Sequence, residues 1–292
     1  MVPQYKLVAV DIDGTLLTSK GTISPRTRQA LQGLSAHGVH LAIATGRRRR
    51  TAQPIVAQLE APHFLIASQG ATVYEDGAIL FHSHLPAPAA RAALDIIRRH
   101  CLPAAILGNA LREEIIWVDG DWRANERLAG YLQRNIQFVR ELTPDALEHD
   151  PIELIVMDTV DRLRRLDEAL TGHRAPPPAE DAPAEQGPDE RRPLWRVIFS
   201  RFQLAAGAAI EIVGPTTSKA NALAFLCGRL GITPQEVLAF GDNVNDLEML
   251  AFAGLGVAMG NATEDARAVA DRIAPSNDED GIAVVLQELG LA

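Results

Sequence analysis

Short apolar runs alternate with segments of helical spacing along this chain, which predicts strands and helices in turn. In the first third of the chain, the apolar runs predicted as strands span residues 7–10, 39–44 and 64–67. A helix is expected to begin at Ser24-Pro25, because serine caps helix N-termini and proline suits the first turn. Strands and helices that alternate through short connections are typical of a parallel sheet covered on both faces, so we predict an α/β fold.

The same alternation returns in the last third, whereas the middle of the chain mixes helical stretches with additional strand-like runs. The strand-like runs of the middle segment span residues 115–118, 152–157, 194–200 and 209–213. We therefore predict a core that is interrupted by an inserted domain with its own mixed sheet. The predicted parts are residues 1–85 (core, first part), 86–214 (insertion) and 215–292 (core, second part).

Residues 174–193 of the insertion are rich in proline and acidic side chains and lack apolar periodicity. Such a segment cannot bury a core, and we interpret it as a connecting loop. A proline-rich motif that binds a partner is the alternative interpretation.

The composition indicates a globular protein and argues against nucleic-acid and membrane partners. Hydrophobic residues make up 47% and charged residues 22%, as in ordinary globular proteins. The 28 Lys and Arg against 37 Asp and Glu give a net charge of −9, which argues against a nucleic-acid partner because phosphate backbones require a basic surface. With only two cysteines, no signal-peptide pattern and no apolar run of about 18 residues, we expect a cytoplasmic protein without a membrane partner. The oligomeric state stays open.

Polar residues follow each predicted core strand and supply the candidate chemistry. The carboxyl ends of parallel strands meet at one edge of a sheet, so these residues are expected to converge. They are Asp11, Asp13, Thr45, Ser68, Asp242, Asn243, Asn245 and Asp246. Carboxylates gathered without cations repel one another, so the cluster indicates a divalent metal, and an oxygen donor set favours Mg²⁺.

The spacing of Asp11 and Asp13 suggests a nucleophile with a proton-transfer partner. Two residues apart on an extended backbone, both side chains point to the same side. One carboxylate could then attack a phosphoryl group, while the other gives a proton to the leaving oxygen and later takes one from water.

Four segments, taken in order, resemble the motifs of the haloacid dehalogenase (HAD) superfamily. They are Asp11-Ile12-Asp13-Gly14-Thr15-Leu16, Ala44-Thr45-Gly46-Arg47, Lys219 and Gly241-Asp242-Asn243-Val244-Asn245-Asp246. The form of the second and fourth motifs, and the large insertion between the second and third, resemble the Cof-type phosphatase branch. The resemblance covers the whole chain. It implies a Rossmann-like parallel-sheet core with a large inserted α+β cap domain.

The resemblance also implies catalytic and metal-binding roles. Asp11 is implied as the nucleophile and a metal ligand, and Asp13 as the general acid/base with its backbone carbonyl on Mg²⁺. Lys219 is implied to stabilise the charge on Asp11 and on the phosphoryl group. Asp242 is implied as a direct Mg²⁺ ligand, and Asp246 as a residue that completes or orients the metal site.

Phosphate contacts are implied for a second group of residues. Thr45 and Gly46 would hold a phosphate oxygen at a helix start, where free backbone N–H groups favour an anion. Lys219 and Asn245 are implied phosphate contacts too, and Asn245 would also support the metal site. Arg47 is expected to contact phosphate or the cap, because positive charge in a first helical turn is otherwise unfavourable. The rest of the basic run, residues 48–50, is interpreted as a solvated helix face.

Two positions depart from the family pattern. Ala220 follows the motif lysine where glycine is usual, and Gln69-Gly70-Ala71 stands where relatives commonly have Asn-Gly-Ala. Gln69 is therefore left out of the predicted phosphate contacts.

The resemblance implies a Mg²⁺-dependent phosphohydrolase that acts on small phosphorylated metabolites, such as sugar phosphates or phosphorylated cofactors, through an aspartyl-phosphate. Two alternatives stay open: a phosphomutase on the same scaffold, and a non-catalytic module that binds a phospholigand. The physiological substrate does not follow from the sequence, because selectivity would lie in cap residues whose geometry the spacing does not reveal.

Overall fold

The computed structural model describes residues 4–108, 115–171, 193–201 and 207–292. The chain divides into two compact units, residues 1–82 with 217–292 and residues 83–216. These boundaries lie within a few residues of the predicted insertion, 86–214, and the independence of the two parts as domains stays a prediction. The predicted proline-rich loop lies outside the described residues, apart from its last residue, Pro193.

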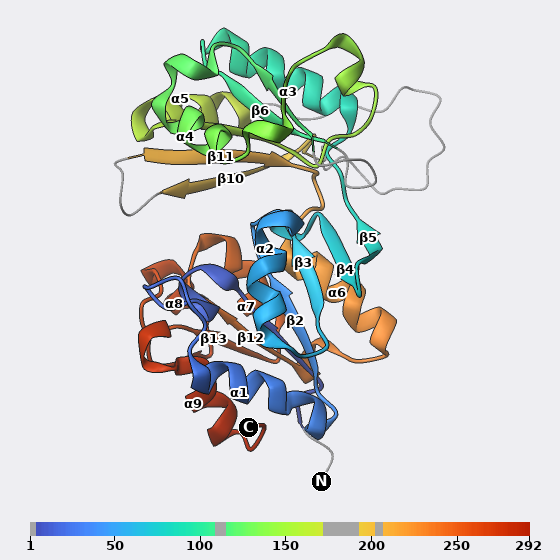
Figure 1. Cartoon of the computed structure of the whole chain (residues 1–292), viewed down its shortest axis with the longest axis vertical. Helices are drawn as coiled ribbons and strands as arrows, with labels where there is room; N and C mark the ends of the chain where they lie inside the picture. Colours follow the sequence, from blue (N-terminus) through green and yellow to red (C-terminus); the bar gives the residue numbers. More distant parts are fainter. Residues whose placement is uncertain (1–3, 109–114, 172–192, 202–206) are drawn as a thin grey trace, which may run out of the picture. The chain divides into compact units, whose positions relative to one another are not determined.

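An eight-stranded sheet forms the centre of the first unit (Figure 1), in the order β14-β13-β12-β1-β2-β3-β4-β5. Its strands are β1 (Leu7–Val10), β2 (His40–Ala44), β3 (Phe64–Ala67), β4 (Thr72–Glu75), β5 (Ala78–His82), β12 (Val237–Gly241), β13 (Leu255–Ala258) and β14 (Arg272–Ile273). The strands from β14 to β3 pair in parallel, which confirms the predicted parallel core.

An antiparallel hairpin at one edge of this sheet was not predicted. β4 pairs antiparallel with both β3 and β5. The turn between β4 and β5 contains Asp76 and Gly77, both with positive φ (47° and 85°). An Asp-Gly pair between two strands is a common hairpin turn, so this dipeptide was the signal that sequence reasoning missed.

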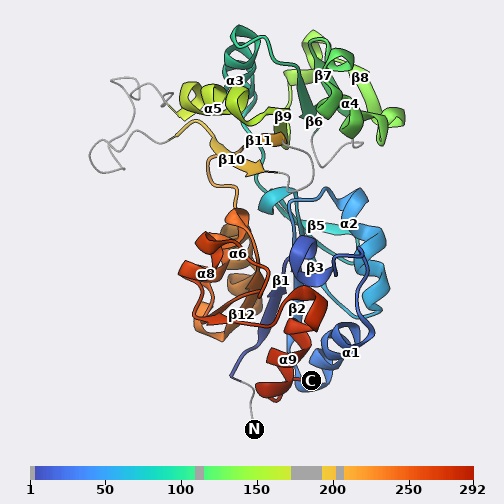
Figure 2. The same cartoon turned by 90° about the vertical axis from the view of Figure 1, so that its left-hand side faces the viewer.

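Helices cover both faces of the core sheet, because alternate side chains of each strand point to opposite sides. They are α1 (Pro25–Gly33), α2 (Arg49–Val56) and α9 (Gly281–Glu288) on one face, and α6 (Lys219–Leu230), α7 (Leu247–Phe252) and α8 (Glu264–Val269) on the other. Val8 of β1 packs in the same apolar cluster as Leu31 of α1, whereas Ala9 packs with Leu223 of α6. Figure 2 shows α1 and α2 on one side of β1 and β3, with α6 and α8 on the other.

The strand order places a topological switch at β1. β1 pairs with β2 on one side and with β12 on the other. The N-terminal half of the core sheet therefore extends from one side of β1, and the C-terminal half extends from the other side. Ligands of open α/β sheets bind outside the carboxyl ends of the strands at such a point. Asp11 follows β1 and Asp242 follows β12, so both lie at this edge.

The second unit contains a six-stranded mixed sheet, in the order β10-β11-β9-β6-β7-β8. Its strands are β6 (Ala104–Leu107), β7 (Ile116–Asp119), β8 (Val139–Glu141), β9 (Glu153–Thr159), β10 (Arg196–Arg201) and β11 (Gly207–Val213). Only the β7–β8 pair is parallel among the described pairings of this sheet. The helices of this unit are α3 (Ala87–Arg99), α4 (Glu126–Gln133) and α5 (Val160–Thr171).

This second unit has an apolar core of its own. Leu94 of α3 and Leu163 of α5 are buried in one cluster with Val156 of β9 and Ile210 of β11. Across both units, none of the described helices is long and apolar enough to cross a membrane.

Candidate active site

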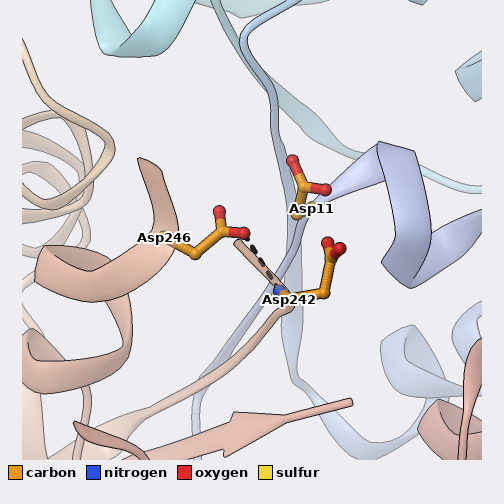
Figure 3. A group of neighbouring side chains, drawn as sticks. All are labelled: Asp11, Asp242 and Asp246. Atoms are coloured by element: carbon orange, nitrogen blue, oxygen red, sulfur yellow. Dashed lines mark hydrogen bonds between the residues drawn. The ribbon is translucent and has the colours of Figure 1, made fainter. Parts of the chain in front are cut away.

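Three carboxylates meet at the switch-point edge of the core sheet. Asp11 and Asp242 follow β1 and β12, and Asp246 ends the 3₁₀ turn Val244–Asp246 that leads into α7. Each offers an oxygen within 4.8 Å of the oxygens of the other two. Figure 3 shows the three carboxyl groups close together. The structure thus brings Asp11 together with two aspartates that lie more than two hundred positions later in the chain.

Lys219 is placed against this group by the start of α6. The Ser218 side chain caps this helix by accepting a hydrogen bond from the backbone N–H of Asn221. The Lys219 side chain is buried, and its Nζ donates to Asp11 Oδ1 and to Asp246 Oδ1, both at 2.6 Å. The predicted proximity of the motif lysine to the first aspartate is therefore present in the structure.

Asp246 serves mainly to orient its neighbours. Its Oδ1 accepts from Lys219, and its Oδ2 accepts from the backbone N–H groups of Asp242 (3.0 Å) and Asn243 (3.1 Å). Since both oxygens already accept hydrogen bonds, Asp246 is better suited to hold the loop than to coordinate a metal. Asp11 and Asp242 are the better candidates for direct coordination.

Thr15 and Gly14 join the first motif to Asp242. Thr15 Oγ1 donates to Asp242 Oδ1 at 3.0 Å. Gly14 adopts a φ of +82°, and a Cβ at this position would overlap the Asp242 carboxylate. Glycine is therefore required here both by the turn and by the close approach of the two loops.

The raised pKa values of Asp11 and Asp242 indicate that the carboxylate cluster has too little positive charge around it. Burial raises the pKa of Asp11 well above its ordinary value, although Lys219 opposes the shift. Burial, together with the nearby charge of Asp246, raises the pKa of Asp242 to about 7. Burial by itself would lower the pKa of Lys219, but Asp11 and Asp246 outweigh it and raise the pKa.

One ammonium among three carboxylates leaves the site short of cationic charge. A divalent cation would supply that charge, and an all-oxygen donor set suits Mg²⁺. The residues present therefore fit such an ion, with Asp11 and Asp242 as the side chains that would hold it.

Asp13 is not one of the three clustered carboxylates and pairs with Arg47. Arg47 Nε donates to Asp13 Oδ2 at 2.7 Å, and Arg47 Nη2 donates to Asp13 Oδ1 at 2.5 Å. The Asp13 side chain is 56% exposed. Arg47 was expected to contact phosphate or the cap, and the ion pair with Asp13 did not follow from the sequence. A contact between Arg47 and phosphate stays a prediction.

The basic run after Arg47 is not a uniformly solvated face, so that interpretation was wrong. Arg48 is buried, and the guanidinium carbon of Arg49 lies 4.7 Å from the centre of the Tyr74 ring. Of these three arginines only Arg50 is exposed.

The predicted phosphate-binding segments lie close to one another beside the carboxylates. Thr45 is buried, and its Oγ1 accepts from the backbone N–H of Arg47 at 3.1 Å. Asn245 Nδ2 donates to Gln69 Oε1 at 3.1 Å. Gln69, which was left out of the predicted site, therefore contacts a predicted site residue. Its place in the turn that directly follows a core strand, next to Ser68, was the available signal.

Comparisons with known proteins agree with this geometry. A family model described as haloacid dehalogenase-like hydrolase matches residues 8–177 and 180–286. The 5-amino-6-(5-phospho-D-ribitylamino)uracil phosphatase YitU of Bacillus subtilis is 32% identical over 288 residues, which cover 97% of this chain and 96% of that protein. Phosphatase YwpJ of the same organism is 27% identical over 309 residues, with 97% and 99% covered.

A solved structure is similar over the same extent. The crystal structure of a haloacid dehalogenase-like hydrolase from Bacteroides thetaiotaomicron superposes with a TM-score of 0.73 at 27% identity. The superposition covers 98% of this chain and 99% of that one. The matched region therefore extends over both units and spans the positions of all four motifs.

Proposed function

Since this chain belongs to the family of haloacid dehalogenase-like hydrolases, we propose that it is a Mg²⁺-dependent phosphatase of small phosphorylated metabolites. The observation that carries this proposal is the buried contact between the Lys219 ammonium and the Asp11 carboxylate, beside Asp242. A binding module has no need of a nucleophilic carboxylate held against a buried lysine. Phosphoryl transfer requires both an attacking group and positive charge near it.

In the first step, an Asp11 carboxylate oxygen attacks the phosphorus atom of the substrate. An O–P bond forms to Asp11, the ester P–O bond breaks, and Asp13 gives a proton to the leaving alkoxide oxygen. In the second step, water attacks the phosphorus and gives a proton to Asp13. The bond to Asp11 breaks, and inorganic phosphate is released.

The remaining residues position these groups and balance charge. Lys219 offsets negative charge on Asp11 and on the phosphoryl oxygens, and Asp246 holds Lys219 in place. The two-pronged pair with Arg47 fixes the orientation of the Asp13 carboxylate. A divalent ion held by Asp11 and Asp242 would supply further positive charge for the phosphoryl group.

The inserted unit is proposed as a cap that excludes water while the aspartyl-phosphate forms and that selects the substrate. Its place in the chain supports this role, because residues 83–216 lie between the second and third motifs. Sugar phosphates and phosphorylated cofactors are the proposed substrate classes. A cytoplasmic location is part of the same proposal, supported by the two unpaired cysteines, Cys101 and Cys227.

A phosphate-release screen tests the proposed function. The purified protein is incubated with a panel of phosphorylated metabolites, including the substrate named for YitU, in Mg²⁺ and in EDTA. We expect one phosphate released per substrate consumed, in Mg²⁺ only. Consumption of a sugar phosphate without phosphate release would instead indicate a phosphomutase. Ligand binding without turnover across the panel would indicate a binding module.

The raised pKa of Asp242 predicts that protons compete with Mg²⁺. Protonated Asp242 is a poor ligand, so at pH 6, below its pKa of about 7, most of the metal-free protein is in the weakly binding form. We expect the Mg²⁺ concentration for half-maximal thermal stabilisation to be about tenfold higher at pH 6 than at pH 8. The measurement is a Mg²⁺ titration of the unfolding temperature at both pH values.

In the metal-free protein, the effect of pH on folding stability has the opposite sign, because protonated Asp242 favours the folded state. The pKa of Asp242 is higher in the folded than in the unfolded chain, so its contribution to stability is full below about pH 4 and is lost as the pH rises through about 7. The Asp242→Asn variant is the control and should weaken this dependence. Equal Mg²⁺ requirements at pH 6 and pH 8 would contradict the prediction.

A further inference from the structure

The 3₁₀ turn Ser68–Gly70, between β3 and β4, connects three segments of the site. The backbone N–H of Gln69 donates to the Thr45 carbonyl at 3.1 Å. Gly70 packs so closely on the start of α6 that a Cβ there would overlap the Ser218 carbonyl. The turn therefore fixes the second-motif loop relative to the helix end that carries Lys219.

The Gln69 side chain extends this connection to the fourth motif. It is buried, with 5% of its surface exposed, and its Oε1 accepts from Asn245 Nδ2 at 3.1 Å. The same carboxamide lies against Gly46, where an added Cβ would overlap Gln69 Nε2. One side-chain amide thus contacts both loops that are proposed to bind the phosphoryl group.

The backbone at this position indicates that the surroundings impose the conformation. Gln69 has a φ of +59°, in the left-handed region that non-glycine residues seldom adopt. Residues in such conformations persist where neighbouring contacts hold them, and they are concentrated at functional sites. Here the hydrogen bonds to Thr45 and Asn245 are among the contacts that hold this conformation.

We propose that Gln69 is a positioning residue that orients Asn245 and supports the Thr45-Gly46 loop for phosphoryl binding. This inference rests on the proposed function. An asparagine amide has two N–H donors and one carbonyl acceptor. Because Gln69 takes one donor of Asn245, the amide plane is fixed, and the second donor keeps one direction. Loss of the Gln69 carboxamide would free the Asn245 amide to rotate and would leave a gap beside Gly46.

The test uses Gln69→Met, which keeps the length of the side chain and removes its hydrogen-bonding groups. The measurements are kcat and KM for p-nitrophenyl phosphate in Mg²⁺ and the inhibition constant of inorganic phosphate, which reports binding apart from chemistry. We expect KM and the inhibition constant to rise about tenfold. This is the size expected when one hydrogen bond to a charged ligand is weakened, here because Asn245 loses the partner that orients it. We expect kcat to change less than about threefold, because Gln69 does not touch the reacting atoms.

A double-mutant cycle separates positioning from general destabilisation. Asn245→Ala should raise the same two constants, and combining it with Gln69→Met should add little, because both remove one interaction. The matched control is Gln32→Met. Gln32 is a half-buried glutamine of α1 whose Nε2 donates to the Leu59 carbonyl at 2.9 Å, and its replacement should leave both constants unchanged.

Several outcomes would overturn the inference. A folded Gln69→Met protein with unchanged KM and inhibition constant contradicts it, and so do additive effects with Asn245→Ala. If Gln69→Met does not fold, Gln69→Asn carries the test, because asparagine tolerates left-handed backbone and its amide ends one methylene short of Asn245. If the wild type releases phosphate and the Gln69 variants keep its KM and inhibition constant, only this inference is overturned. A wild type that releases no phosphate overturns the proposed function and this inference with it.

Discussion

Asp11→Asn is expected to lower phosphate release by at least about 10³-fold, because an amide oxygen is a poor nucleophile for phosphorus. The replacement is nearly isosteric and removes a buried negative charge, so the fold should persist. Since burial raises the pKa of Asp11, the metal-free variant should be at least as stable as the wild type. The measurement is single-turnover and steady-state phosphate release in Mg²⁺, together with thermal unfolding.

Asp278→Asn provides the matched control for Asp11→Asn. Asp278 is exposed, and its Oδ1 accepts from the backbone N–H of Ser19 at 2.8 Å, which an asparagine can also do. Its replacement should leave turnover unchanged. Wild-type turnover in a folded Asp11→Asn protein would disprove the aspartyl-phosphate mechanism.

Lys219→Ala is expected to impair both stability and turnover. It would leave the buried carboxylates of Asp11 and Asp246 without their shared ammonium. Removing one partner of a buried ion pair costs about 3–5 kcal/mol of unfolding free energy. Loss of a charge that faces the phosphoryl group should lower kcat by about 10²–10³-fold. Denaturant unfolding and phosphate release measure the two effects.

A second variant separates the structural from the catalytic effect of Lys219. Lys219→Met combined with Asp246→Asn removes one charge of each sign, so it should recover part of the lost stability while turnover stays low. Lys6→Ala is the surface control, because the Lys6–Glu236 pair at 2.6 Å is partly exposed and should contribute far less. Full turnover in the stabilised double variant would show that Lys219 acts only on the fold.

Much of the core could be predicted from local pattern. β1 and β3 begin and end where the apolar runs do, and Ser24 accepts a hydrogen bond from the Thr27 backbone N–H as an N-cap should. Strand polarity then follows from the alternation with helices. Since parallel strands present their carboxyl ends at one edge, the convergence of Asp11 and Asp242 followed from the sequence as well.

The partners of flexible side chains could not be predicted in this way. Arg47 pairs with Asp13, and Arg48 is buried, although both belong to one basic run in the sequence. A long side chain reaches several alternative partners, and the packing of neighbouring loops decides among them. The Asp76-Gly77 hairpin could have been predicted from its dipeptide.

The amino-acid sequence by itself determined the α/β core. It also predicted the insertion between the two halves of the core and a site of acidic residues with one lysine, because these predictions depend on periodicity and on ordered motifs. Only the tertiary structure decided how Lys219 is shared between Asp11 and Asp246, and that Gln69 connects Asn245 with the Gly46 loop. Such contacts join residues far apart in the chain at separations of a few ångströms. Those separations depend on how helices and turns pack on the sheet, which no local pattern encodes.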